Sequence, residues 1–323
     1  MIEKIIEYSA KNRFFVFLGV IFFNLWGIWA IRNIPLDALP DLSDTQVIVF
    51  VRWDRPPQIV EDQVTYPIVT ALLGAPKVKD IRAFSDYGFS FIYVIFEDGT
   101  DIYWARSRVL EYLSKIIPGL PPDVKVEIGP DATGLGWVFE YALIDKSGKH
   151  SLDELRTFQD FHLKYALQSV KGVAEVASVG GFVRQYQIIV DPVKITSLGI
   201  SIDEISRAVK ASNQEIGARL IEFSGIEYMV TVRGYIKDIK DIENIVLKVR
   251  EDGIPVKVKD VAEVKLGPDI RRGIVELDGI GEVVGGIVVM RYKENALNVI
   301  KRVKEKLKEI KLPEGVELVI TYD

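Results

Sequence analysis

The segment Phe14–Ile31 constrains this chain more than any other, because eighteen residues in a row carry no charge. It reads FFVFLGVIFFNLWGIWAI and is flanked by Arg13 and Arg32. As an α-helix it would span about 27 Å, close to the roughly 30 Å hydrocarbon core of a bilayer, and flanking arginines can extend their charged ends to the headgroups. The sequence therefore predicts a transmembrane helix with its span at residues 14–31.

Two other interpretations of this segment fit less well. A secretory signal peptide has a shorter apolar core and small residues at its cleavage site, whereas Arg32-Asn33-Ile34-Pro35 follows here. A buried helix of a soluble protein has one polar face, and this segment is apolar on all sides apart from Asn24. We expect Asn24 to face another helix, because amides hydrogen-bond between helices within a membrane.

Basic residues set the expected orientation of the span. Lys4, Lys11 and Arg13 precede it, and positive charges favour the cytoplasmic side of a membrane. No other run in the sequence reaches the length of a span. The sequence therefore predicts a single-pass membrane protein with a cytoplasmic N-terminus and a body outside the cytoplasm, which in a bacterium is the periplasm.

The composition excludes several functions for that body. The 323 residues include no Cys, two His and three Met, which argues against Cys nucleophiles, zinc sites and soft-metal thioether clusters. The net charge of −5 offers nucleic acid no general attraction. The glycine pairs lack the strand–GxGxxG–helix setting of a dinucleotide site. We expect no catalytic residues, no cofactor, no metal ligands and no enzyme activity.

Alternating segments after Pro40 predict a split βαβ, or ferredoxin-like, unit. Pro67 should kink its first helix, and Asp101 is a good N-cap for the second. The predicted segments are strand Gln46–Val51, helix Gln58–Leu73, strands Val78–Ala83 and Phe89–Phe96, helix Asp101–Ile117 and strand Val124–Ile128.

A second unit of this kind begins at Trp137 and is interrupted by an insert of about ninety residues, bracketed by Gly180-Gly181 and Gly267-Pro268. The capping-box pair Ser151 and Glu154 marks its first helix. The predicted segments of the unit are strand Trp137–Ile144, helix Ser151–Val170, strands Val173–Val179 and Glu282–Tyr292, helix Ala296–Ile310 and strand Val316–Tyr322. Those of the insert are strand Arg184–Val190, helix Ile202–Ser212, strand Tyr228–Val232, helix Ile239–Ile245 and short strands up to Val264.

The predicted fold class is thus a membrane-anchored α+β protein, with one N-terminal transmembrane helix and two ferredoxin-like (βαββαβ) units. An α/β insert interrupts the second unit. The expected boundaries are 1–32 for the transmembrane region, 33–130 for the first unit, 131–180 with 268–323 for the second, and 181–267 for the insert.

A series of motifs runs in order along the whole chain. They are Pro35–Asp44 (PLDALPDLSD), Gln58–Pro67 (QIVEDQVTYP), Tyr93–Tyr112 (YVIFEDGTDIYWARSRVLEY), Gly129–Gly136 (GPDATGLG), Glu175–Gly181 (EVASVGG), Ala211–Glu215 (ASNQE), Gly267–Gly273 (GPDIRRG) and Leu312–Asp323. With these motifs the chain resembles the heavy-metal-efflux (Cus/Czc-type) branch of the resistance–nodulation–division inner-membrane transporters.

The resemblance implies a layout and a set of partners. The two ferredoxin-like units would be porter subdomains, the insert a docking subdomain, and the helix with Gln58–Pro67 a lining of the central axis of a trimer. Expected partners are the membrane, the C-terminal portion of the pump in a homotrimer, a periplasmic adaptor, an outer-membrane channel and the transported metal cation.

Two residues are cleft candidates by the same resemblance. Arg82 matches an arginine of the porter cleft. Ile270 stands where copper and silver members carry Met in G-P-x-M-R-R-G, which counts against a monovalent soft-metal route and leaves zinc, cobalt, cadmium or a lost function open. The Arg52–Pro57 segment (RWDRPP) also departs from the family, because it replaces a Y-P-G turn.

The family pattern continues beyond Asp323 into a membrane bundle that holds the proton-relay carboxylates, and later into the metal-binding methionines. The expected function is therefore that of the N-terminal part of a proton-driven heavy-metal cation efflux pump, inactive in transport by itself. The alternative is a single-pass, membrane-anchored periplasmic scaffold or binding protein without transport activity.

Overall fold

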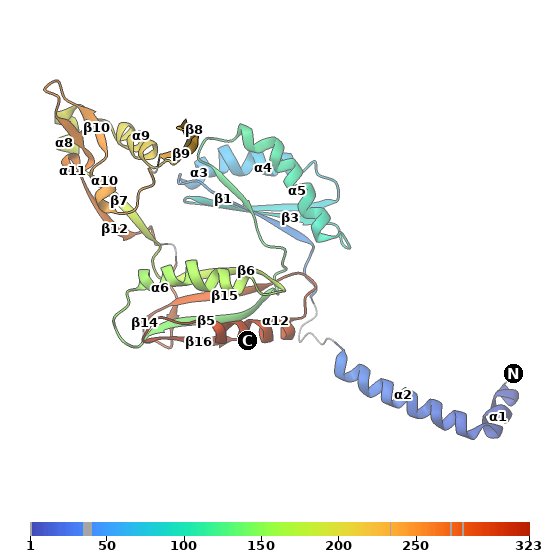
Figure 1. Ribbon diagram of the computed structural model, residues 1–323. Coiled ribbons are helices and arrows are strands. Elements are labelled where there is room, and N and C mark those ends of the chain that lie inside the picture. Colours follow the sequence, from blue (N-terminus) through green and yellow to red (C-terminus); the bar gives the residue numbers. More distant parts are fainter. Residues whose placement is uncertain (1, 35–40, 233, 272, 280) are drawn as a thin grey trace.

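The computed structural model describes residues 2–34, 41–232, 234–271, 273–279 and 281–323. It shows a mixed α/β body and two N-terminal helices that extend away from it (Figure 1). Residues 35–40 of the first family motif and Arg272 of the Gly267–Gly273 motif lie outside the described residues.

The apolar segment forms one long helix, as the sequence predicts. Helix α1 (Ile2–Lys11) precedes it, and α2 (Arg13–Asn33) contains the whole uncharged run and no buried residue. Among the described helices, α2 alone is long and apolar enough to cross a membrane. The side-chain amide of Asn24 donates to the carbonyl of Val20, 2.8 Å away in the same helix, so in this chain it contacts its own backbone.

The first four-stranded sheet has the strand order β2-β3-β1-β4, and its pairs are antiparallel. The strands are β1 (Gln46–Arg52), β2 (Val78–Asp86), β3 (Phe89–Phe96) and β4 (Lys125–Ile128). The helices are α3 (Pro57–Val60), the π-helix η1 (Glu61–Thr65), α4 (Tyr66–Leu72), α5 (Ile102–Ile116) and the short 3₁₀-helix η2 (Ile117–Gly119). The predicted β-α-β-β-α-β order is confirmed over these residues, and β2 extends three residues further than predicted.

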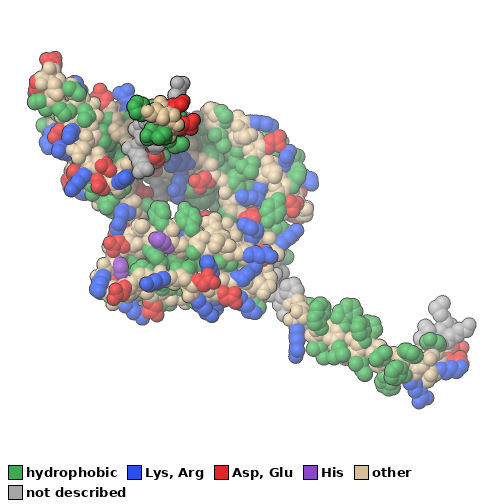
Figure 2. Space-filling model, in the orientation of Figure 1, with side chains coloured by type: hydrophobic (Ala, Val, Ile, Leu, Met, Phe, Trp, Pro, Cys, Tyr) green, Lys and Arg blue, Asp and Glu red, His purple; other side chains and the backbone are tan. Residues whose placement is uncertain are grey.

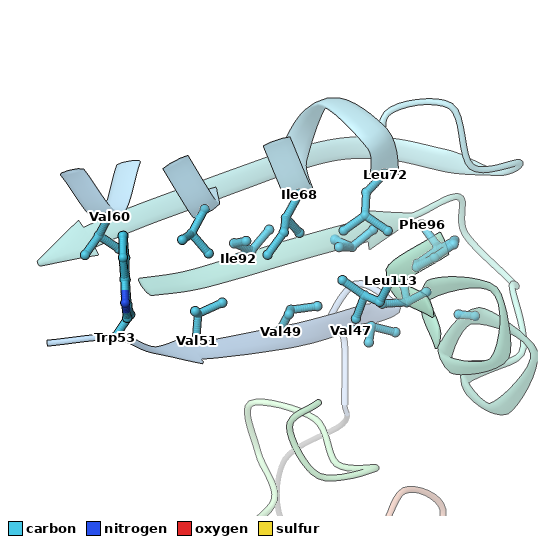
Figure 3. Packing of buried hydrophobic residues seen from close by; sticks show 14 residues of the cluster. Val47, Val49, Val51, Trp53, Val60, Ile68, Leu72, Ile92, Phe96 and Leu113 are labelled. Atoms are coloured by element: carbon cyan, nitrogen blue, oxygen red, sulfur yellow. The ribbon is translucent and has the colours of Figure 1, made fainter. Parts of the chain in front are cut away.

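Alternation along β1 builds the core of this part. Val47, Val49 and Val51 are buried and face Ile68 and Leu72 of the helical layer (Figure 3). Period-two alternation of this kind buries one face of a strand and leaves its other face for polar or partly exposed side chains. The carboxylate of Asp101 accepts from the N–H groups of Tyr103 and Trp104 at 3.0 and 2.9 Å, so the predicted cap is confirmed.

The disturbance predicted at Pro67 takes the form of the π-helical turn η1. The N–H of Tyr66 donates to the carbonyl of Glu61, five residues back. A wider turn moves aside the carbonyl that the proline ring would otherwise meet. The turn also places the buried Thr65, whose hydroxyl donates to Ser90 at 2.8 Å and bonds Ser85 at 2.9 Å. The helix is thereby tied to the sheet by hydroxyl groups.

The second four-stranded sheet has the order β16-β5-β15-β6, again with antiparallel pairs. Its strands are β5 (Trp137–Asp145), β6 (Val173–Gly180), β15 (Val284–Met290) and β16 (Val316–Tyr322). Its helices are α6 (Leu152–Phe158), the π-helix η3 (Gln159–Leu163), α7 (Lys164–Gln168) and α12 (Ala296–Glu309), and they share one core with the sheet.

A second π-helical turn, η3, stands in the first helix of this unit and was not predicted, because no proline marks it. Gln159 in η3 is fully buried. Its carbonyl oxygen accepts from the Tyr141 hydroxyl at 2.9 Å, and its amide donates to Ser178 at 3.3 Å. Burial raises the pKa of Tyr141 well above its usual value, so the phenol keeps its proton and remains a donor.

The insert leaves and rejoins the second unit through two paired strands, β7 (Arg184–Val190) and β12 (Ala262–Pro268). Its other elements are α8 (Pro192–Leu198), α9 (Ile202–Ser212), the hairpin β8 (Ile216–Phe223) with β9 (Ile226–Val232), α10 (Ile239–Glu243), β10 (Val246–Val249), β11 (Pro255–Lys257) and α11 (Val258–Val261). The short strands β13 (Glu276–Leu277) and β14 (Gly281–Glu282) follow. The sequence predicted neither α8, which Asp191 and Pro192 begin, nor β8.

The close approach of β15 to β5 supplies a test of this packing. A methyl group on Gly286 would overlap the hydroxyl end of the Tyr141 ring, at Cζ and Oη, whereas Gly119 has nothing within 4 Å of such a group. We expect Gly286→Ala to lower the free energy of unfolding by about 1–3 kcal/mol through overpacking. Urea denaturation of the full chain in detergent, followed by tryptophan fluorescence, measures this. Gly119→Ala is the control, and equal stability of the two variants would contradict the packing described.

Candidate functional site

A cleft of about 790 Å³ lies between the end of the first sheet and the strands that connect the second sheet to the insert. Figure 2 shows the body hollowed between these parts. The first sheet and its loops contribute Arg52, Trp53, Asp54, Arg55, Gly88, Asp123 and Lys125. The second unit and the start of the insert contribute Arg156, Ser178, Val179, Gly180, Gly181, Phe182, Val183, Gln185, Asp269, Ile270, Arg271, Gly273, Ile274 and Val275.

The turn after β1 forms the first wall of the cleft. Trp53 is buried against the end of the core, as Figure 3 shows, and its N–H donates to Gly88 O at 3.0 Å. The N–H of Gly88 returns a bond to Arg55 O at 3.1 Å. The guanidinium of Arg55 then lies 5.2 Å from the ring centre of Trp53, a cation–π distance. The segment that departs from the family's Y-P-G turn is therefore built around an aromatic–arginine stack.

Two glycines form the opposite wall. Gly180 and Gly181 have φ of +71° and +64°, in the left-handed region where a side chain is strained. Arg156 is mostly buried and holds this turn, because it donates to Gly180 O at 2.7 Å and to the Asp160 carboxylate at 2.8 Å. The turn redirects the chain from β6 into β7.

Ile270 is one of the two cleft candidates, and it lines the cleft. The N–H of its neighbour Asp269 donates to Val183 O at 2.8 Å. This bond holds the segment that contains Ile270 beside the start of the insert. Ile270 itself is 61% exposed. Next to it, Arg271 lies 5.0 Å from the ring centre of Phe182 and forms an ion pair with Glu282.

Arg82, the other candidate, lies outside the residues that line the cleft. It sits on β2 opposite Tyr93, and its side chain is 73% exposed. Its Nε donates to Asp80 at 3.0 Å, on the same strand. The structure therefore does not bring Arg82 and Ile270 into one pocket, and the cleft role of each remains a prediction.

The chemistry of the cleft is polar and slightly basic. Five basic side chains line it against three carboxylates, and the described lining residues include no His or Met. Across the described chain, no group of three or more His, Asp or Glu side chains is placed to hold a metal ion. The described walls can guide a solute or receive a protein segment, but they do not supply a set of soft-metal ligands.

A separate polar contact joins the two units at Asp131, in the Gly129–Gly136 motif. Its carboxylate accepts from the Tyr103 hydroxyl of the first unit at 3.1 Å and forms an ion pair with Arg291 of the second, 3.0 Å from Nε. Its carbonyl accepts from Tyr292 N–H at 2.8 Å. Burial and the bond to Asp131 both raise the pKa of Tyr103, so its hydroxyl stays protonated as a donor. We call this group the inter-unit junction.

A smaller cavity of about 300 Å³ adjoins the inter-unit junction. It is lined by Asp41, Ser43, Asp44, Thr45, Gln46, Ile102, Ala132, Thr133, Met290, Tyr292, Lys293 and Glu294. Burial would raise the pKa of Asp41, but hydrogen bonds from Thr133 and Ser43 outweigh it and lower the pKa below its usual value. Asp41 therefore ties the start of the body to the loop that links the two units.

Sequence reasoning missed Asp131 and Arg291 as structural partners. The glycine-rich motif around Asp131 indicated only a turn, because an aspartate in a turn most often hydrogen-bonds its own nearby backbone. Nothing local pointed to Arg291, which lies at the end of β15 and is brought to the motif only by the fold.

The chain matches proteins of one family along nearly its whole length. A family model described as the AcrB/AcrD/AcrF family matches residues 5–323. The chain is 56% identical to the putative cation efflux system protein SilA of Salmonella typhimurium and 55% identical to the cation efflux system protein CusA of Escherichia coli K12, each over 326 aligned residues.

A solved structure of a heavy metal efflux pump is similar in fold, with a TM-score of 0.89 and 29% identity over 99% of this chain. The chain spans about a third of the length of these relatives: 31% of SilA and of CusA, and 32% of the solved pump.

The inter-unit junction can be tested by removing its charge. We expect Asp131→Asn to broaden the distances between spin labels on the two units, since Arg291 loses its ionic partner. We expect it also to lower the free energy of unfolding by about 1–2 kcal/mol. Electron paramagnetic resonance on the pair Lys115→Cys and Lys308→Cys measures the distances, because the chain has no Cys of its own.

The matched control is Asp98→Asn, whose carboxylate is 86% exposed and lies 3.8 Å from Lys79. An exposed pair of this kind contributes about 0–1 kcal/mol. A distance distribution for Asp131→Asn as narrow as that of the control would show that the junction does not hold the two units.

Proposed function

The chain belongs to the AcrB/AcrD/AcrF family, and from this membership we propose that it forms the N-terminal part of a proton-driven heavy-metal cation efflux pump. The observation that carries the proposal is 55–56% identity along the whole chain to two cation efflux system proteins. Because the chain spans 31% of each, the rest of such a pump would hold the proton path. The chain would act in transport and not as an enzyme.

We propose that α2 anchors the chain in the inner membrane and that the body is periplasmic. Residues 33–130 would be the first porter subdomain, 131–180 with 268–323 the second, and 181–267 the docking subdomain. Two observations support this division: each four-stranded sheet has its own core, and the insert is attached through the paired strands β7 and β12.

In this pump, metal would pass along the cleft, and the described residues of this chain would form one side of its whole path through the protein. The described lining residues lack His and Met, so the soft ligands would come from the remainder of the protein. Ile270 would face the passing cation as an apolar side chain, and Arg82 would act from the exposed surface of β2. The helix from α3 to α4 would line the central axis, where Glu61, Asp62 and Tyr66 are exposed.

We propose that the assembled pump is a homotrimer and that the hairpin β8–β9 holds neighbouring copies together. Leu220, Ile221, Phe223, Ile226 and Met229 of the hairpin are each more than half exposed, and no described hydrophobic core includes them. Exposed apolar groups on this scale favour a protein partner. The rest of the docking subdomain would meet a periplasmic adaptor and an outer-membrane channel.

A hybrid pump tests the function. Residues 1–323 of this chain, fused to the C-terminal two thirds of CusA, would be expressed in Escherichia coli that lacks its own CusA. We expect the hybrid to restore growth on at least one of silver, copper, zinc, cobalt or cadmium salts, because the two parts together complete the fold and the proton path. Growth at graded metal concentrations is the measurement.

The control strains express residues 1–323 alone or the CusA portion alone, and neither should grow better than the empty strain. A hybrid that inserts in the membrane and assembles, yet protects against none of the metals, would contradict the proposal and favour a scaffold without transport. Protection by residues 1–323 alone would contradict the claim that the rest of the pump is required.

The trimer contact is tested in the same hybrid. We expect the double variant Phe223→Asp, Met229→Asp to shift the detergent-solubilised pump from trimer to monomer, because burying two unpaired carboxylates in an apolar contact between copies is costly. Mass determination by light scattering measures the shift. Ile202→Asp, on α9 of the same insert and 64% exposed, is the control that should leave the mass unchanged. An unchanged trimer in the double variant would rule out this hairpin as the contact.

A further inference from the structure

The short helix α1 is a second structural element beside the span, and the proposed function gives it no role. It covers Ile2–Lys11 and joins α2 at Asn12. Figure 1 shows α1 turned away from the axis of α2. At 1.5 Å per residue its ten residues extend about 15 Å, which is too short to cross a bilayer.

The residues of α1 divide by type between two sides of the helix. Glu3, Glu7 and Lys11 recur every four residues, so they share one side, and all three are exposed. Positions 2, 5, 6 and 9 carry Ile, Ile, Ile and Ser, and this spacing places them on the opposite side. Ile6 is 62% exposed, so no described residue covers it.

The charged side of α1 is balanced. Lys11 Nζ donates to Glu7 Oε1 at 2.7 Å, and the remaining Glu3 and Lys4 carry opposite charges. A helix without net charge gains little from anionic headgroups, so its affinity for a membrane must come from its apolar side.

Two side chains bond to the backbone at the end of α1. The side-chain amide of Asn12 donates to Tyr8 O at 3.0 Å, and Arg13 Nε donates to Ala10 O at 3.1 Å. The last carbonyls of a helix are otherwise unpaired, which is costly where water is scarce, so these two bonds lower the cost of placing this end of the helix near lipid. The break between α1 and α2 lies at Asn12, with φ −111° and ψ 46°.

We propose that α1 is an interfacial helix that lies in the plane of the membrane. Its side with Ile6 enters the boundary between headgroups and acyl chains, and Glu3, Glu7 and Lys11 remain in water. The partner is a zwitterionic phospholipid surface, which is continuous with the bilayer around α2. The inference rests on the proposed membrane anchor, because only a spanning α2 brings α1 to that surface.

Single spin labels on the full chain in phosphatidylcholine nanodiscs test the placement. The variants are Ile6→Cys, Glu7→Cys and Phe22→Cys in the middle of α2, and the chain has no Cys that would compete for the label. Oxygen, which enters lipid, and a water-soluble nickel chelate are compared as relaxing agents. We expect the oxygen-to-nickel ratio at Ile6→Cys to exceed that at Glu7→Cys by about threefold, with Phe22→Cys higher still.

The outcomes separate this inference from the anchor. Equal ratios at Ile6→Cys and Glu7→Cys, with Phe22→Cys in lipid, would overturn the interfacial helix and leave the anchor intact. A Phe22→Cys label in water would overturn both. Spin–spin broadening of the Ile6→Cys label would show that a second copy covers this side of α1 and would also overturn the proposal. Oxygen-to-nickel ratios that do not change at high salt would support binding to the membrane through apolar contacts.

Discussion

The antiparallel pairing of β6 with β15 is the contact on which the layout of the body depends. Gly180 stands opposite Val284, so the chain leaves the second sheet and returns to it at the same end of these two neighbouring strands. An insert can therefore be placed at this end without separating the strands that carry the core. The pairing of β7 with β12 continues the arrangement outward, from Arg184 opposite Pro268 to Val190 opposite Ala262. The segments that connect the β6–β15 pair to the β7–β12 pair form the second wall of the cleft, so this wall follows from the two pairings.

Most of the regular elements could be predicted, because the strands alternate and the helices begin with marked caps. Asp101 carries its predicted cap contacts, and β1 buries every second residue. The π-helical turn η3 could not be predicted, because it accompanies the hydrogen bond between Gln159 and Tyr141, which are far apart in the sequence, and no local sequence signal marks it. Most residues that line the cleft could not be predicted either, because its walls come from turns far apart in the sequence. Of the two residues suggested by resemblance, only Ile270 lines it.

In the proposed pump, the body would shape the path of the metal while other parts of the protein bind the metal. Trp53 with Arg55, and Phe182 with Arg271, are stacked pairs on opposite walls of the cleft, and pairs of this kind fix shape without offering soft ligands. In the proposed pump this division would let the cleft open and close while coordination chemistry takes place on other parts of the protein. The low content of His, Met and Cys, which first argued against a metal protein, fits such a role.

The two π-helical turns have a mechanical consequence. Thr65 and Gln159 each hold the first helix of a unit to hydroxyl groups of its sheet. Sliding either helix along the sheet by one residue would leave these buried groups without partners, at a cost of about 1–3 kcal/mol for each. Any large motion of the body would then take place between the two units, where it would have to break the contacts of Asp131, or at Gly180 and Gly181, where the insert begins.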